Sequence, residues 1–221
     1  MLTYGGGPPV VAAYRALGAR GCVPIYNGLD PATHFPAPPD PAYAVDLAFL
    51  GNRLPDREAR VETFLLQPAA ALPGCRFLLG GSGWGDKAVP ANVKALGHVP
   101  TADHNAFNGA PRAVLNIARD SMAATGFSPA TRLFEAAGAA ACLITDAWEG
   151  IELFLRPGSE ILVARDGADV AEALRTLTPA AAHAIGAAAL RRCLAEHTYQ
   201  RRAAQVHAVL AETLARGRAA A

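Results

Sequence analysis

The feature that most constrains the fold is the alternation of short, almost entirely apolar runs with longer helical stretches. The apolar runs are VDLAFLG (45–51), CRFLLGG (75–81), VKALGHV (93–99), AVLNIA (113–118), ACLIT (141–145) and EILVA (160–164). Strands that are apolar on both sides are typical of a parallel sheet with helices on both faces. We therefore expect residues 45–197 to form one complete, doubly wound α/β domain.

The segments on either side of this domain are too short to fold alone. Residues 1–36 contain one amphipathic helix and one short strand, and we expect them to be the remnant of a preceding α/β domain. NGLDPATHFPAPPDP (27–41) is rich in Pro, Asp and Gly, which favours an extended connection, and we place the linker at 37–44. The tail 198–221 predicts a helix that crosses back to residues 1–36 through an apolar stripe at Val206, Val209 and Leu210.

Charge and cysteine usage narrow the function classes. The net charge is +1 without a basic block, so neither nucleic acid nor an anionic membrane surface is indicated as a partner. No apolar run reaches the ~20 residues that span a bilayer, and the N-terminus does not resemble a signal peptide. The four cysteines stand far apart, which argues against a zinc site and favours reduced thiols in the cytoplasm.

In open parallel sheets, ligands bind beyond the carboxyl ends of the strands, so the loops that follow the strands are the candidate site. Four of these loops are polar and contain glycine: GNR (51–53), GGSGWGDK (80–87), RDSMAATGFSP (119–129) and DAWEGIE (146–152). GGSGWG is not a dinucleotide fingerprint, because Asp86 stands where the last glycine belongs. Gly81 and Gly83 either let the backbone approach a ligand closely or simply form a turn.

The segment SPATRLFEAAG (128–138) places two charges on an otherwise apolar helix. Ser128 is a favourable N-cap and Pro129 a favourable first residue, so Arg132 is expected near the helix start. A cation there opposes the helix dipole, but an arginine beside a helix N-terminus suits a phosphate group. Glu135, at i+3, lies on the same face and can accept hydrogen bonds from sugar hydroxyls. The alternative is a surface ion pair that contributes little.

Several motifs in order resemble the donor-binding half of GT-B glycosyltransferases. They are TRLFEAAGAAACLITDAWEGIELF, PGSEILVARDGADVAEAL and LAEHTYQRRAAQV, together with FLGNRLPDRE (49–58) and GHVPTADHNAFN (97–108). The resemblance covers about 45–210 and is greatest to the family of the spore maturation protein CgeB, near the group that includes glycogen and sucrose-phosphate synthases. It implies a Rossmann-like fold and a nucleotide-sugar donor whose sugar is transferred to an unknown acceptor.

The resemblance also implies roles for individual residues. Glu135 matches the glutamate that binds the donor ribose, Arg132 matches the arginine of the CgeB-like RxFE pattern, and Arg53, followed by Arg57, matches the residue that contacts the diphosphate. No metal or other cofactor is needed where arginines and a helix N-terminus neutralise the diphosphate. The donor-binding set that we expect is Asn52, Arg53, Gly81, Gly83, Asn116, Arg119, Ser128, Arg132, Glu135 and Asp146.

The sequence departs from the family pattern in two ways. The larger group has a second glutamate near the donor sugar where this chain has Phe127, so sugar contacts and stereochemical outcome cannot be carried over. Only residues 1–36 represent the acceptor-side domain, so we expect a fragment of a longer protein or a partner chain that supplies the other half.

No catalytic residue is assigned from the sequence. His104 is the one histidine expected near the cleft, either as a general base or as a helix-capping or surface residue. Two other functions stay open: a non-catalytic nucleotide-sugar-binding module and a nucleotide-sugar epimerase of related fold.

Overall fold

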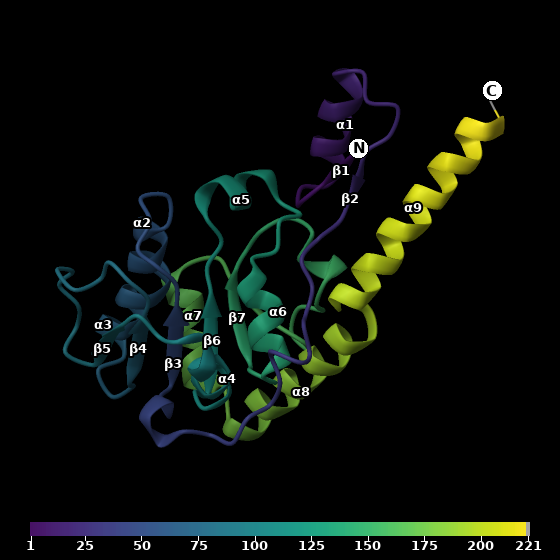
Figure 1. The fold of residues 1–221 in the computed structure, drawn as a ribbon. Helices are drawn as coiled ribbons and strands as arrows, with labels where there is room; N and C mark the ends of the chain where they lie inside the picture. The colour runs from purple at the N-terminus through teal and green to yellow at the C-terminus, as the bar shows by residue number, and fades with distance from the viewer. Residues whose placement is uncertain (220–221) are drawn as a thin grey trace.

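The computed structural model describes residues 1–219 and is built around a six-stranded parallel sheet (Figure 1). The strand order is β5-β4-β3-β6-β7-β8, and every neighbouring pair is parallel. The bounds are β3 (Leu47–Leu50), β4 (Phe77–Gly80), β5 (Val93–Gly97), β6 (Ala113–Asn116), β7 (Leu143–Asp146) and β8 (Leu162–Ala164). The expected doubly wound α/β class is confirmed, and each strand falls on a predicted apolar run, with β7 extending one residue beyond its run to Asp146.

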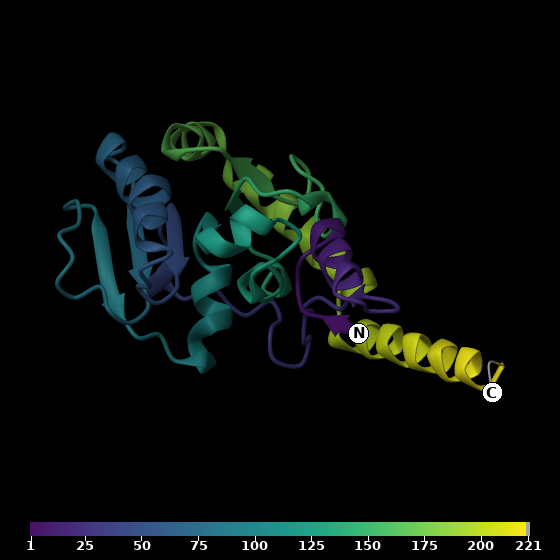
Figure 2. The same cartoon turned by 90° about the horizontal axis from the view of Figure 1, so that it is seen from above.

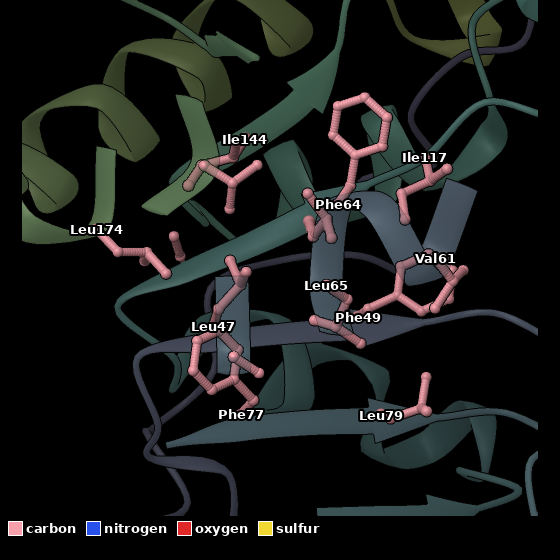
Figure 3. Close-up of a cluster of buried hydrophobic side chains, with 14 of the residues drawn as sticks. Leu47, Phe49, Val61, Phe64, Leu65, Phe77, Leu79, Ile117, Ile144 and Leu174 are labelled. Atoms are coloured by element: carbon pink, nitrogen blue, oxygen red, sulfur yellow. The ribbon is translucent and has the colours of Figure 1, made fainter. Parts of the chain in front are cut away.

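Helices cover both faces of the sheet because alternate strand residues point to opposite sides. One face packs against α2 (Glu58–Val61), the π-helical turn η2 (Glu62–Leu66), α3 (Gln67–Ala71) and α7 (Gly167–Thr176). Figure 3 shows the side chains of this core, including Phe49 from β3, Phe64 from η2 and Leu174 from α7. The other face packs against α4 (His104–Gly109), α6 (Thr131–Gly138) and α8 (Pro179–Glu196).

The π-helical turn has a local cause in the sequence. Pro68 lies inside the continuous helical stretch 58–71, where it has no N–H to donate and its ring crowds the preceding turn. A wider turn just before Pro68 relieves this conflict. Gly167, at the start of α7, packs directly on the bulge, so that a Cβ there would lie 2.3 Å from the Thr63 carbonyl oxygen.

The N-terminal segment stands beside the domain and adds little core. It consists of β1 (Leu2–Thr3), α1 (Pro8–Ala16) and β2 (Val23–Pro24), with β1 and β2 paired in parallel. None of the α1 residues is buried.

The connection from this segment to the sheet is more than a polar linker. Leu29 is fully buried, and its backbone exchanges hydrogen bonds with the start of the last helix, to the His197 oxygen at 2.7 Å and from the Tyr199 nitrogen at 3.0 Å. The Leu29 side chain rests on Gly138 at the end of α6. A short 3-10 helix, η1 (Pro41–Tyr43), then leads into β3. The run 27–41 therefore contributes a residue to the core, which its composition does not predict.

The last helix, α9 (Tyr199–Ala219), contacts the N-terminal part of the chain through its first turn. Arg202 is buried there and donates to the Asn27 carbonyl oxygen at 3.1 Å. Farther along, the helix projects away from the body of the molecule in both views (Figures 1 and 2). Leu210 is 53% exposed, so the expected apolar packing on residues 1–36 does not extend to that position.

Candidate functional site

The four polar loops predicted from the sequence converge at the carboxyl edge of the sheet, because all six strands point the same way. The Asn52 side-chain oxygen accepts a hydrogen bond from the Ser82 N–H at 2.9 Å, which ties the first loop to the second. Phe127 donates its N–H to the Glu149 carbonyl oxygen at 2.6 Å, which ties the third loop to the fourth. The third loop also contains a short helix, α5 (Asp120–Thr125), which was not predicted from the sequence.

Gly81 and Gly83 are required by the packing of these loops. Both have positive φ angles, +119° and +90°, which side chains rarely adopt. A Cβ at Gly81 would lie 2.2 Å from the Gly51 carbonyl oxygen, and one at Gly83 would lie 3.1 Å from the Arg53 Cβ. Their positions fit the turn interpretation of GGSGWG.

Arg53, the first match to a diphosphate-binding residue, is held by carboxylates. Its guanidinium makes two hydrogen bonds to Glu58, at 2.8 and 2.7 Å, and a third to Asp86 at 2.8 Å. Lys87 joins the same network and contacts Glu58 at 2.9 Å. The hydrogen bond from Arg53, followed by that from Lys87, lowers the pKa of Glu58 to about 2. The positive charge of Arg53 is therefore already compensated.

Arg57, the second match, is less compensated and lies among other cations. Burial lowers the pKa of Arg57, and the positive charges of Arg119 and Arg132 lower it further. Arg119 forms an ion pair with Asp56 at 2.8 Å. In the described part of the chain, the Arg57 Nε is buried without a hydrogen-bond partner. This group of three arginines favours the binding of an anion.

Arg132 and Glu135 lie together on α6 but do not satisfy each other. Arg132 Nη1 is 3.0 Å from Glu135 Oε2, within ion-pair range, yet the two atoms make no hydrogen bond. Among residues 1–219, Arg132 Nε and Nη1 and Glu135 Oε2 are all buried without a hydrogen-bond partner. Burial also lowers the pKa of Arg132. Unpaired buried donors and acceptors are costly, and a polar ligand can satisfy them.

Ser128 does not cap this helix, contrary to the sequence-based prediction. Helix α6 begins at Thr131 with Ala130 as its N-cap. The Ser128 hydroxyl instead accepts the N–H of Gly6 at 2.9 Å, a contact between positions far apart in the chain. Arg132 remains in the first turn, so the charge near the helix start is as expected.

His104 lies at the start of α4, close enough to α6 for Arg132 and Glu135 to act on it. Burial, and then the charge of Arg132, lower the pKa of His104, so the ring is neutral near pH 7. One ring nitrogen lies 3.3 Å from the Val99 carbonyl oxygen, and the ring stacks on His34 with centroids 6.5 Å apart. The His34 Nδ1 is buried and unpaired within the described residues. No local sequence pattern marks His34 as a site residue, so it was not predicted.

Asn116 and Asp146 are buried at the ends of two neighbouring strands. The Asn116 amide donates to the Thr145 hydroxyl at 2.9 Å. Asp146 accepts the Ala118 N–H at 3.0 Å and forms an ion pair with Arg60 on α2. Asp146 therefore connects β7, the loop after β6 and α2. Arg60, its partner, lies 86 positions earlier in the chain and was not predicted as a site residue.

Phe127 occupies the junction between this edge and the N-terminal segment. It adopts a left-handed conformation with φ +47°, which is unusual for a bulky residue. A Cβ at Gly7 or at Gly150 would lie 2.3 Å from its ring. The ring is therefore held between the backbone of the N-terminal segment and that of the fourth loop.

The parallel sheet, its two helical layers and this cationic carboxyl edge define the class of the protein: a Rossmann-like α/β domain of the GT-B glycosyltransferase type. The chain belongs to the glycosyl transferase-like family, whose model matches residues 57–208. No curated protein sequence matches the chain.

Solved structures of glycosyltransferases share the fold. Sucrose-phosphate synthase from Thermosynechococcus elongatus superposes with a TM-score of 0.75 at 16% identity, over 97% of this chain and 58% of that one. HepE of Anabaena in complex with UDP-glucose gives 0.73 at 13% identity, over 96% and 64%. AviGT4, a glycosyltransferase involved in avilamycin A biosynthesis, gives 0.63 at 18% identity, over 96% and 64%. This chain thus spans about three fifths of the length of these proteins.

Proposed function

We propose that the carboxyl edge binds a nucleoside diphosphate sugar and that the chain is the donor-binding half of a glycosyltransferase. The observation that carries this proposal is the set of buried Arg132 and Glu135 atoms that make no hydrogen bond, although the two side chains form an ion pair. Buried polar atoms without a hydrogen bond require an explanation, and a bound polar ligand is one that fits this edge. The family match supports the proposal, and so does HepE, a protein of the same fold that was solved with UDP-glucose.

The carboxyl edge has a hydrogen-bond acceptor for the ribose of such a ligand and cationic donors for its diphosphate. Glu135 is an acceptor for the two ribose hydroxyls, and Arg132 is a donor for the diphosphate. Arg57 and Arg119 add positive charge on the same side, as the lowered pKa of Arg57 indicates. We assign the diphosphate to Arg57 rather than to Arg53, because Glu58 and Asp86 already neutralise Arg53. With three arginines available, the diphosphate needs no metal ion.

The acceptor side requires structure beyond the donor edge. We propose that a second α/β domain, from a longer chain or from a partner, faces the edge and meets α1 and the projecting part of α9. Exposed apolar side chains such as Leu17 and Leu214, 83% and 64% exposed, suit such a contact. Neutral His104 is then the candidate general base. We also place the protein in the CgeB-like branch and in the cytoplasm, where its four unpaired thiols stay reduced.

The donor site is tested by titration calorimetry of UDP, ADP and GDP against the wild type, Arg132→Ala and Glu135→Gln. Losing a charge-assisted hydrogen bond is expected to weaken binding by about 10- to 150-fold. Matched controls are Arg175→Ala and Glu172→Gln, an exposed i,i+3 ion pair on α7 with a separation of 3.2 Å. Unchanged affinity together with lower thermal stability would mean that Arg132 and Glu135 are only structural.

The non-catalytic alternative makes a different prediction. Radiolabelled UDP-sugars are incubated with the 221-residue chain alone, and release of UDP and free or transferred sugar is followed over time. Binding without turnover by the chain alone, and turnover once an acceptor domain is added, would support a donor half. Binding without turnover in both cases would favour a nucleotide-sugar-binding module.

A further inference from the structure

A second cleft, of about 400 Å³, lies at the amino end of the sheet, opposite the donor edge. Its lining includes the start of α8, which lies at the lower end of the ribbon in Figure 1. Its walls are mainly alanine, glycine and proline, and its polar side chains are Asp46, Arg76, Arg112 and His183. A volume of this size suits a small ligand, since binding clefts commonly measure roughly 300–1,000 Å³.

The sheet topology brings three of the charged residues side by side. Asp46, Arg76 and Arg112 each immediately precede a strand, namely β3, β4 and β6. Because β3 lies between β4 and β6, Asp46 stands between the two arginines. The backbone holds this arrangement: Asp46 donates its N–H to the Arg76 carbonyl oxygen at 3.0 Å, and Arg112 donates to that of Val45 at 2.8 Å.

The contacts leave this cleft with an uncompensated positive charge. One Asp46 oxygen pairs with Arg112 Nη2 at 2.9 Å, and the other accepts the Arg76 backbone N–H at 2.8 Å. Arg112 also donates to the Leu177 carbonyl oxygen at 3.2 Å, while its Nε is buried without a partner. Within residues 1–219 no carboxylate pairs with the guanidinium of Arg76. The guanidinium of Arg76 and the exposed ring of His183, which both line the cleft, are therefore available to bind an anion.

The rest of the lining supports an anionic ligand with a small apolar part. Burial raises the pKa of the Cys142 thiol to about 12, so this side chain adds no negative charge. The N-terminal end of α8, an 18-residue helix, contributes Pro179, Ala182 and His183 to the lining, so the positive end of the helix dipole lies at the cleft. The alanine and proline walls can cover a few carbon atoms.

We propose that this cleft is a second binding site, for a small molecule that carries a phosphate group, separate from the donor edge. Arg76 supplies a planar pair of N–H donors, His183 a further donor, and the Asp46–Arg112 pair a fixed polar floor. We infer binding alone, without a chemical step, at this cleft. This inference does not depend on the proposed donor site.

The test is two-dimensional NMR of the ¹⁵N-labelled 221-residue chain during titration with inorganic phosphate and with glycerol 3-phosphate. We expect saturable shifts of the amides of Val45, Arg112 and His183 with both probes, at lower concentrations for glycerol 3-phosphate because its carbon atoms meet the apolar walls. Arg76→Gln should weaken binding at these amides by about tenfold or more.

Matched variants distinguish phosphate binding at the second cleft from binding at the donor edge or elsewhere on the surface. Arg175→Gln removes an exposed arginine elsewhere and should leave the titration at the second cleft unchanged. Arg132→Gln should likewise leave it unchanged, although shifts at the donor edge are lost. Arg76 is exposed, so Arg76→Gln should fold normally, which its amide spectrum will show. Shifts confined to the donor edge, or shifts at the second cleft that Arg76→Gln does not weaken, would overturn the proposal.

Discussion

Ala140 is a single residue in a conformation that its side chain disfavours. It follows the end of α6 with φ +58°, in the left-handed region where a Cβ costs roughly 1–2 kcal/mol. Ala140→Gly should therefore raise the free energy of unfolding by about 1 kcal/mol, measured by urea denaturation. Ala139→Gly is the control, because Ala139 has φ −79° and gains nothing from glycine. Equal effects of the two substitutions would contradict this explanation.

His197 should make stability depend on pH. It is buried next to Arg202, and burial, followed by the Arg202 charge, lowers the pKa of its ring from 6.5 to about 4. Between about pH 4 and pH 6.5 the unfolded chain binds a proton that the folded chain excludes. The free energy of unfolding should therefore rise with pH between about pH 4 and pH 6.5 and reach its full value above pH 6.5.

The pH effect is measured by urea denaturation at pH 4.5, 5.5 and 7. His197→Gln should flatten the dependence, whereas substitution of exposed His207 on α9 to Gln should not. Glu58 affects stability in a different pH range. Because the pKa of its carboxyl is lowered to about 2, the stability that its ion pairs contribute is fully present above pH 4.5 and is lost only at lower pH. An unchanged slope in His197→Gln would show that another group titrates.

At this scale the sequence identified the types of residue but not their partners. Arg132 and Glu135 could be chosen because a helix spaces them at i+3. Arg60 could not, because its partner Asp146 lies 86 positions away. Arg53 was preferred to Arg57, yet only the folded structure shows that Glu58 and Asp86 enclose it.

At the scale of elements, the tight docking of α7 on the π-helical turn gives a sharp prediction. Gly167→Ala introduces a Cβ 2.3 Å from the Thr63 carbonyl oxygen, so the helices must shift. We expect a loss of about 1–3 kcal/mol of unfolding free energy. Gly85→Ala, where a Cβ meets nothing within 4 Å, should change it by less than about 0.5 kcal/mol. Similar values for both would mean that α7 adjusts without strain.

Strands were more predictable than helix boundaries, for a physical reason. An apolar run such as that of β3 has one way to be buried on both faces, whereas a helix start depends on which partner a side chain finds. Ser128 bonds to Gly6, so α6 starts later than its sequence suggests. Helix α5 has no side-chain cap and no buried residue, and so leaves no periodic signal.

At the scale of the whole molecule, the two chain ends differ in what they contribute to stability. Leu29 is fully buried between α6 and the start of α9, so Leu29→Ala should cost about 2–5 kcal/mol of unfolding free energy. Leu210→Gln and Leu214→Gln should each change it by less than about 0.5 kcal/mol, because these side chains are 53% and 64% exposed. Thermal and urea unfolding of the three variants checks this contrast. A large loss from either α9 substitution would show that the projecting helix is covered.

No helix in the described part of the chain is long and apolar enough to cross a membrane.

The overall fold class was predictable from the sequence because the alternation of apolar strands and helices determines the sheet. The position of the N-terminal segment was not, since it depends on contacts of Gly6, Gly7 and Asn27 with residues more than a hundred positions away.

The pairing of Leu29 with Thr198 has a mechanical consequence. The chain enters the domain at residues 27–29 and leaves it at 197–199, and these two crossings run side by side with hydrogen bonds between them. The two crossings therefore restrain each other, and the N-terminal segment is tied to the domain at the same place where the last helix leaves it. Phe127, held between Gly7 and Gly150, is a second place at which the N-terminal segment is fixed to the domain.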